Sequence, residues 1–129
     1  MKNLFVLSLF VGCGGFFGSI CRYLTGVFMQ RFTEHWQLGT LAANMFGCFI
    51  IGGVMTLSSR GITLSPEARL ALATGFCGGF TTMSTMVFEG ILMARNTQLL
   101  LAGLYYGGSL LLSIGAFYGG VMVIKVIVR

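Results

Sequence analysis

The sequence predicts an all-α membrane protein with four transmembrane helices, and three properties of its composition lead to this fold class. Hydrophobic residues make up 56% of the 129 residues and charged residues only 9%, whereas a soluble domain carries roughly 25% charged residues. The mean hydropathy is +0.91. The apolar residues form continuous runs of the length that spans a bilayer, about 20 residues each, rather than the alternating segments of ~10 residues typical of a β-barrel.

The charges, cysteines and histidine exclude several classes of function. The net charge is +5, but the basic residues occur singly at the edges of apolar runs, so no basic stripe indicates nucleic-acid binding. The four cysteines lie inside apolar runs without a CxxC pair, which argues against a disulfide framework or a zinc site. The sole histidine, His35, falls in a polar loop, and no nucleophile and base are paired in the sequence, so we do not expect an enzyme.

The chain is predicted to form one transmembrane domain over residues 1–129, with spans at about 4–29, 38–57, 67–94 and 99–124. The first span follows Lys2 and precedes Arg31. Its start resembles a signal peptide, but the apolar run continues well past Cys13, which favours a membrane helix. Arg22 lies in its far half, about 27 Å along the helix from Leu4. Arg22 is therefore either a functional intramembrane charge or a side chain that snorkels to the interface.

The second span combines a stripe of small residues with an adjacent polar stripe. Spacing of four residues places Gly39, Ala43 and Gly47 on the first stripe. The same spacing places Thr40, Asn44 and Cys48 on the second stripe. The small stripe suits close helix packing. The polar stripe suits either a polar lining or hydrogen bonds that hold helices together.

The third span is predicted to begin at Pro66, capped by Ser65, and to be interrupted in its middle. Ser at the cap and Pro at the first helical position are typical of a helix start. Residues 75–86 are crowded with glycine and hydroxyl side chains, and we expect the helix to break within 78–83. A break at membrane depth exposes carbonyls at one half-helix end and N–H groups at the next, which suits ion binding. The alternative is a continuous helix whose glycines allow close packing.

The fourth span carries a ladder of hydroxyl groups. Tyr105, Ser109 and Ser113 share one face at a spacing of four residues. Neutral donors can replace the hydration shell of an anion stepwise without trapping it at a fixed charge. Glu89 lies near the end of the third span, where its side chain is expected to reach water or the vestibule of Arg22.

The basic residues also indicate an orientation. With four spans, both termini and the 58–65 loop share one side of the membrane. Five basic residues lie on that side and two on the other: Lys2, Arg60, Arg69, Lys125 and Arg129 against Arg31 and Arg95. This bias favours the termini inside the cell. Pairs of small residues four apart occur in every span and permit tight contacts, and because four short helices enclose little, a dimer is expected.

Three segments together resemble the small fluoride-channel family known as Fluc or CrcB. Residues 14–23 read GGFFGSICRY, residues 39–47 read GTLAANMFG and residues 75–86 read GFCGGFTTMSTM. They are similar to the family patterns GGxxGAxxRY, GTLxxNxxG and GxxGGxTTFSTF, in the same order and at the same spacing. The resemblance implies an antiparallel dimer with two fluoride pores at the interface, in which a structural Na⁺ is held by the backbone carbonyls of Gly78 and Thr81.

The resemblance also implies roles for individual side chains. Arg22 would sit at the aqueous vestibule. The pore would be lined by Asn44, Thr82, Met83, Ser84, Thr85, Met86, Tyr105, Ser109 and Ser113. Met83 and Met86 stand where the family has phenylalanines, whose positively polarised ring edges face the anion; a thioether offers only weakly polarised methyl hydrogens and a soft sulfur. Such a channel, a multi-pass protein of the prokaryotic plasma (inner) membrane, confers fluoride resistance by passive electrodiffusive export.

Two other functions stay open at this point. A proton-coupled small multidrug exporter is also a four-helix dual-topology dimer, but it needs a carboxylate in the membrane, usually in the first span, which has none here. A non-conducting subunit of a heterodimeric fluoride channel is the other, because two methionines replace the phenylalanines. The five-to-two distribution of basic residues also leaves open whether the dimer is a homodimer or a paired heterodimer. A single chain that inserts in both orientations should carry nearly equal numbers of basic residues on its two sides.

Overall fold

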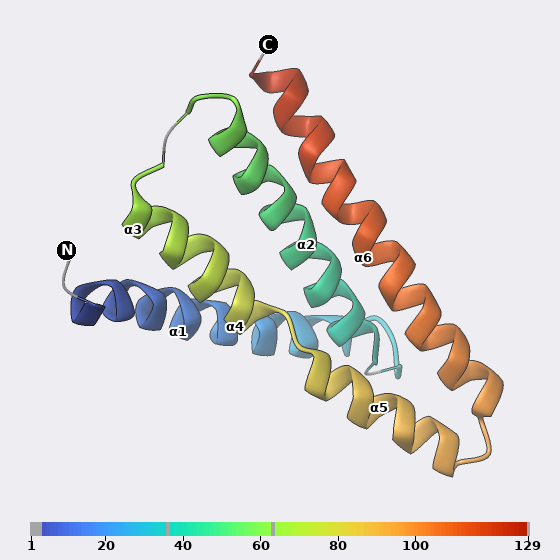
Figure 1. Ribbon diagram of the computed structural model, residues 1–129. Helices are drawn as coiled ribbons and strands as arrows, with labels where there is room; N and C mark the ends of the chain where they lie inside the picture. Colours follow the sequence, from blue (N-terminus) through green and yellow to red (C-terminus); the bar gives the residue numbers. More distant parts are fainter. Residues whose placement is uncertain (1–3, 36, 63, 129) are drawn as a thin grey trace.

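The computed structural model describes residues 4–35, 37–62 and 64–128, and throughout these ranges the regular elements are helical (Figure 1). Helix α1 spans Leu4–Met29, α2 spans Gln37–Ser59 and α6 spans Leu99–Ile127. The third span is a series of joined segments: α3 (Pro66–Arg69), η1 (Leu70–Cys77), α4 (Gly78–Phe80) and α5 (Met83–Arg95). Within the described residues, four helical stretches are long and apolar enough to cross a membrane. The predicted fold class is therefore confirmed, and the chain is a multi-pass membrane protein.

The third span begins as predicted and departs from a regular α-helix twice. The Ser65 side chain accepts a hydrogen bond of 3.2 Å from the N–H of Ala68, and Pro66 occupies the first helical position. Segment η1 is a π-helix, which the residue pattern does not predict. The break follows at Thr81 and Thr82, whose backbones are extended. Figure 1 shows the resulting change of direction between α4 and α5.

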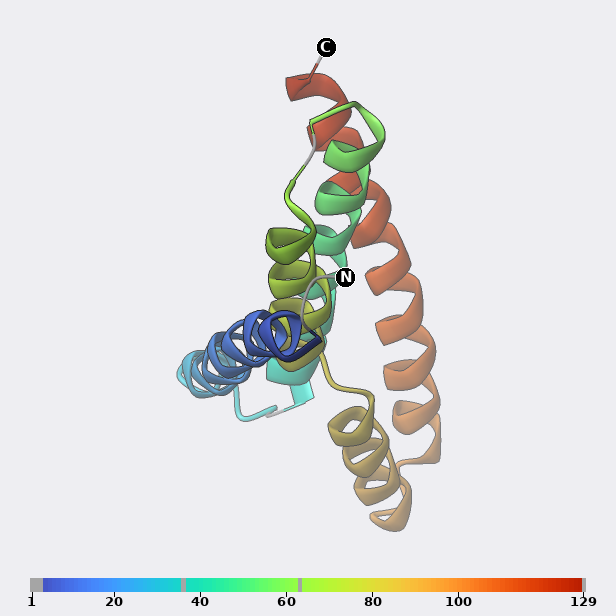
Figure 2. The ribbon, with the colours of Figure 1, turned by 60° about the vertical axis from the view of Figure 1, so that its left-hand side comes forward.

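Glycines set how closely the helices approach. A side-chain carbon on Gly14 or Gly18 of α1 would collide with the backbone carbonyl of Ala71 or Phe76 in η1. One on Gly75 would come within 2.6 Å of the Val11 carbonyl oxygen on α1. Figure 2 shows α1 foreshortened, against the third span and away from α6. The α1 contact therefore anchors the segment that leads into the break.

Helices α2 and α6 pack along each other in the same way. A side-chain carbon on Gly52 would meet the Phe117 carbonyl, and one on Gly120 would meet the Phe49 carbonyl. The predicted small stripe of α2 is also buried: Gly39 faces Gly26 of α1, and Gly47 faces Thr81 at the break. Because glycine carries no side chain, backbones touch directly here, and α2 lies at the centre of the bundle.

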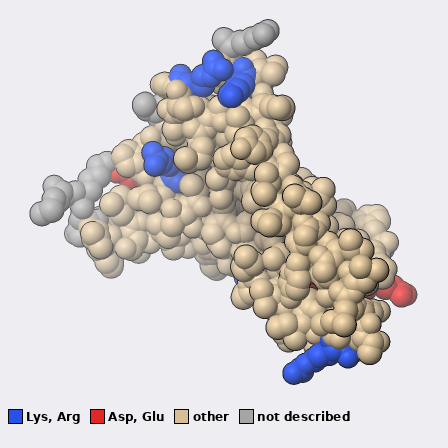
Figure 3. All heavy atoms as spheres, turned by 45° about the vertical axis from the view of Figure 1, so that its right-hand side comes forward, with Lys and Arg blue, Asp and Glu red and all other residues tan. Residues whose placement is uncertain are grey.

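Most of the outer surface is apolar. Large hydrophobic side chains on α1 and α6 are widely exposed in the single chain, including Leu4, Phe16, Leu100 and Leu111. Figure 3 shows basic side chains in the upper part and at the lower end of the molecule, with a broad, mostly uncharged surface between them. Such a surface is stable only against lipid or another subunit. Lys2 and Arg129, which contribute to the predicted charge bias, lie outside the described residues.

Candidate functional site

One side chain satisfies the backbone at the break in the third span. The Oδ1 atom of Asn44 accepts a hydrogen bond of 2.7 Å from the N–H of Thr82, and its Nδ2 atom donates one of 3.3 Å to the carbonyl of Thr82. In hydrocarbon an unpaired backbone group is costly, so a break persists only where protein or a polar pathway satisfies it. Asn44 therefore holds the break to α2.

The hydrogen bond between Asn44 and Thr82 leaves the backbone carbonyl of Gly78, on the other side of the break, without its usual helical partner. In a continuous helix the N–H of Thr82 would donate to the carbonyl of Gly78, but here it donates to Asn44. Both the N–H and the hydroxyl of Thr81 donate to the Cys77 carbonyl, each at 2.9 Å. The Gly78 carbonyl thus loses its helical donor. No group of three or more His, Cys, Asp or Glu side chains able to hold a metal occurs within the described ranges.

Three hydroxyl groups meet at the start of α5. The buried Thr82 caps the helix, since its Oγ1 atom accepts from the N–H of Thr85 at 3.2 Å. The same hydroxyl donates to Thr85 Oγ1 at 3.0 Å and lies 3.1 Å from Ser84 Oγ. Because Thr82 donates to Thr85, the Thr85 O–H remains available to donate elsewhere. The structure thus brings Asn44, Thr82, Ser84 and Thr85 together.

The two methionines lie on the first turns of α5. Met83 is 68% exposed, and Met86 is half-buried. Ser84, between them, is also exposed in the single chain. The donor cluster therefore opens onto a face that this chain does not cover by itself.

Glu89 is buried, although its side chain was expected to reach water or the vestibule of Arg22. It is 2% exposed, and its carboxylate accepts hydrogen bonds from the hydroxyl of Thr40 at 2.6 Å and from the hydroxyl of Tyr105. The expectation was wrong because α5 packs this face against α2 and α6. Tyr105 accordingly lies with Thr40 and Glu89 rather than with the hydroxyl cluster at the break.

A pattern in the sequence could have identified this second cluster. On α2, Thr40 and Asn44 are four residues apart and share a face. On α5, Thr82 and Glu89 are seven residues apart and also share a face. Two antiparallel helices with these faces opposed make two successive contacts, Asn44 with Thr82 and Thr40 with Glu89. The hydroxyl of Thr40, one turn from Asn44 on α2, therefore meets Glu89, two turns from Thr82 on α5.

The three hydroxyl groups predicted to form a ladder on α6, those of Tyr105, Ser109 and Ser113, lie in different surroundings. Tyr105 is bound to Glu89. Ser109 is 2% exposed, and its hydroxyl has no hydrogen-bond partner within the described part of the chain. Ser113 is half-buried one turn further on. Ser109 lines a cavity of about 340 Å³ between α2, α5 and α6.

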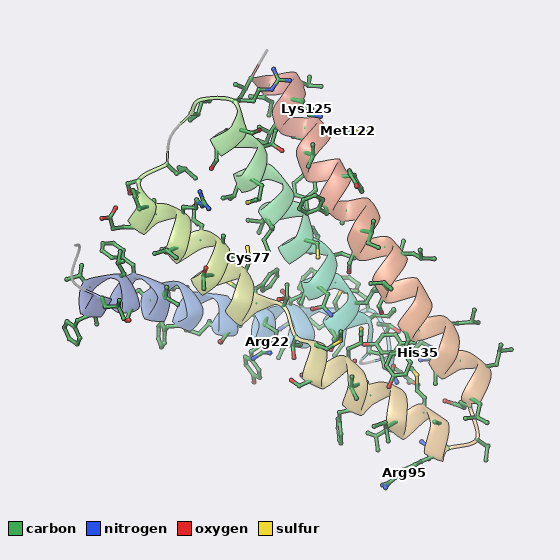
Figure 4. All side chains as sticks on the ribbon, in the orientation of Figure 1. Arg22, His35, Cys77, Arg95, Met122 and Lys125 are labelled. Carbon is green, nitrogen blue, oxygen red and sulfur yellow. The ribbon has the colours of Figure 1, made fainter. Side chains whose placement is uncertain are left out.

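Arg22 lies close to the break on the α1 side. It is one helical turn beyond Gly18, at which a side-chain carbon would collide with the backbone of Phe76 and reach the N–H group of Phe80. Arg22 is half-buried (Figure 4). A cationic group is therefore carried beside the end of α4.

The family comparison and the individual relatives point to the same family of membrane proteins. The profile of the family described as "CrcB-like protein, Camphor Resistance (CrcB)" matches residues 9–121. A protein of Chlorobium phaeobacteroides (strain BS1) named "Fluoride-specific ion channel FluC" is 39% identical over 125 residues, 97% of this chain and 98% of that protein. Proteins of the same name from Chlorobaculum tepidum and Prosthecochloris aestuarii are 46% and 43% identical over 110 residues, 85% of this chain and 84% and 86% of theirs.

Proposed function

The chain belongs to the CrcB family, and from that premise we propose that it is a fluoride-specific ion channel, not an enzyme, through which fluoride leaves the cell down its electrochemical gradient. The observation that carries the proposal is the break held by Asn44, which gathers three hydroxyl groups at the start of α5. An exporter driven by protons is set aside, because the described residues of α1 contain no carboxylate and the family is one of channels.

The donors at the break suit a small, strongly hydrated anion. The first N–H groups of α5, those of Met83 and Ser84, have no carbonyl partner within the helix, and a helix N-terminus carries partial positive charge. Hydroxyl groups of Ser84 and Thr85 add neutral donors beside them. Together these groups replace water molecules around the ion. With no fixed cation among them, the ion is not held too tightly to leave.

Met83 and Met86 line the same passage in this proposal. Both lie within the first four residues of α5, on the turn that carries the donor cluster. A methionine side chain is flexible and polarisable, and its terminal methyl hydrogens are only weakly positive. These two side chains therefore exclude water from the ion while offering less attraction than the phenyl edges found in the family.

The open face of the donor cluster supports an assembly of two subunits. Met83 and Ser84 are exposed in the single chain, so the passage needs a second wall. We assign that wall to a second subunit in the opposite orientation in the plasma (inner) membrane of a prokaryote, giving two pores at one interface. The second subunit is either another copy or a paired homologue.

The break also suits a structural Na⁺. The backbone carbonyls of Gly78 and Thr81 would hold it, since the N–H of Thr82 is diverted to Asn44 and leaves the Gly78 carbonyl without its helical donor. A bound Na⁺ supplies positive charge that fixes carbonyl groups at the end of one half-helix. Asn44 contributes by holding the next half-helix in place.

Fluoride release from liposomes tests the proposal. Purified protein is reconstituted with internal fluoride, a K⁺ ionophore is added, and release is followed with a fluoride electrode. A chloride-loaded preparation and an Asn44→Ala variant serve as controls. We expect rapid release of fluoride, little release of chloride, and a loss of at least tenfold in Asn44→Ala, because that change leaves both backbone groups of Thr82 unpaired.

The outcomes separate the remaining alternatives. Release of chloride as fast as fluoride, or full fluoride release by Asn44→Ala, would contradict the proposal. If the chain alone releases no fluoride but does so with a paired homologue, the assembly is a heterodimer. If the homologue gives the same rate without this chain, this chain is a non-conducting subunit.

A further inference from the structure

Tyr106 of α6 contacts α5 at two successive points, beside the start of that helix. Its hydroxyl donates a hydrogen bond of 2.8 Å to the backbone carbonyl of Val87. Its ring lies over Gly90, where an added side-chain carbon would overlap the ring and the hydroxyl oxygen. Gly90 is buried, so the tyrosine ring fills the place that a side chain would take. Tyr106 therefore both packs against α5 and is hydrogen-bonded to it.

The glycine beneath the ring shares a face of α5 with both methionines. Gly90 lies four residues beyond Met86 and seven beyond Met83, and these spacings return to the same face of a helix. We call this set of three residues the methionine face. The neighbouring face, which we call the hydroxyl face, is displaced by one residue at each position and carries Thr82, Thr85 and Glu89.

Two adjacent tyrosines of α6 hold these two adjacent faces of α5. The hydroxyl of Tyr105 donates to Glu89 of the hydroxyl face, and Thr40 of α2 donates to the same carboxylate. Tyr106 covers the methionine face at Gly90 and bonds to the carbonyl of Val87. Helices α5 and α6 lie side by side and are joined by the turn at 96–98 (Figure 1). The rotation of α5 about its axis is thus held from two directions.

This rotation is not set by the helix that precedes α5. The backbones of Thr81 and Thr82 are extended, so no continuous helix passes orientation from α4 to α5. A rotation of about 20° moves a side chain that lies about 5 Å from the helix axis by about 2 Å. Binding sites hold their groups to within about 0.5 Å. Contacts with neighbouring helices must therefore fix the direction in which Met83 and Met86 point.

We propose that Tyr106 is a positioning residue of the channel, which fixes the rotation of α5 and so holds the two methionines at the ion passage. The inference rests on the proposed channel function and adds to it a residue that acts through α5 rather than on the ion. In the membrane, water does not replace the lost partner of a backbone group. The net contribution of one hydrogen bond corresponds to a factor of about 2–10 in an equilibrium between two arrangements.

Single-channel recording separates a positioning role from a merely structural one. Tyr106→Phe removes the hydroxyl and keeps the ring, and we expect the fluoride current of one channel in a planar bilayer to fall about two- to tenfold. A merely structural role would lower the number of channels and leave the current of each one unchanged. Gly90→Ala displaces the ring and should give a similar fall. The double variant should be no worse than the stronger single one, because both changes remove the same contact.

The methyl signals of the two methionines test the contact without transport. Nuclear magnetic resonance spectra are recorded in detergent micelles with ¹³C-labelled methionine methyl groups, and Met83→Leu and Met86→Leu identify the two signals. We expect Tyr106→Phe to shift both signals, because rotation of α5 changes their surroundings. The matched control is Tyr118→Phe, which removes the hydroxyl of a tyrosine that is 59% exposed and lies about three turns further along α6. It should leave the signals and the current unchanged.

The outcomes distinguish the proposal from the function on which it rests. An unchanged single-channel current or unmoved methionine signals in Tyr106→Phe would overturn the positioning role, as would equal effects of Tyr118→Phe. If Tyr106→Phe does not fold, Gly90→Ala decides by the same measurements. Absence of fluoride current from the unsubstituted protein, with or without a paired subunit, would instead contradict the channel function. The methionine signals would still show whether Tyr106 fixes α5.

Discussion

At the scale of single residues, the side-chain amide of Asn44 replaces the hydrogen-bond partners that Thr82 would have in a continuous helix. An asparagine side chain has the same donor and acceptor as a peptide group, and it meets the N–H and the carbonyl of Thr82 together. The third span can therefore stop being helical without leaving polar backbone in hydrocarbon. Serine or threonine offers a single hydroxyl, and an aspartate offers acceptors only. The identity of residue 44 follows from these requirements.

Glu89 is a buried acceptor for two hydroxyl groups, and its removal should be costly. Glu89→Ala leaves the hydroxyls of Thr40 and Tyr105 without their partner, which costs about 1–3 kcal/mol for each. Glu89→Gln keeps one carbonyl oxygen and lets a hydroxyl rotate to accept from its amide, so we expect a smaller loss. Thermal unfolding in detergent micelles measures both. Equal stability of Glu89→Ala and the unsubstituted protein would contradict the contacts seen here.

Met83 offers a direct test of what the two methionines do. The side chain is 68% exposed, so Met83→Phe introduces a ring without crowding the single chain. A ring edge carries positive polarisation toward an anion, whereas a thioether does so only weakly. We expect Met83→Phe to raise the ratio of fluoride to chloride release severalfold. The control is Leu110→Phe, which adds a ring to the outer face of α6. An equal rise in the ratio of fluoride to chloride release in this variant would contradict a role for the ring edge at position 83.

At the scale of elements, the contact between α1 and the third span is made by backbones. Glycines on both helices allow it, and η1 adopts a π-helix where it runs along α1. We expect Gly18→Ala to destabilise the protein, because the added carbon collides with the Phe76 carbonyl. Gly12→Ala on the same helix is the matched control, since nothing lies within 4 Å of its added carbon and alanine favours a helix. Thermal unfolding compares the two; equal midpoints would contradict this account.

The break could be predicted from the sequence, whereas two features around it could not. Glycine and hydroxyl residues at 75–86 disfavour a regular helix locally, so composition alone indicated the interruption. The π-helix lies where the third span packs against α1, and the burial of Glu89 depends on α2 and α6 meeting α5. Both features lie at contacts between segments that are distant in the sequence. Spacing along one helix identified faces but did not say which faces would meet.

At the scale of the whole molecule, the described chain leaves two of its faces uncovered. Gly103, Gly107 and Gly115 of α6 have no atom within 4 Å of an added side-chain carbon, whereas Gly120 of the same helix is in tight contact with α2. The start of α5 opens on an uncovered face as well. Small residues on a membrane helix let another helix approach closely. These positions suit a second subunit, which would also complete the passage beside Met83.

The distribution of charge bears on which chain that second subunit is. Arg60, Arg69 and Lys125 lie on one side, and Arg31 and Arg95 on the other. Positive charge is retained inside the cell, so we expect most copies to insert with the C-terminus inside. C-terminal fusions to two reporters, one active only inside and one only outside, measure the orientation. A chain that pairs with itself in antiparallel fashion must insert both ways, so a near-equal split would indicate a homodimer, and a strong bias requires a partner of opposite orientation.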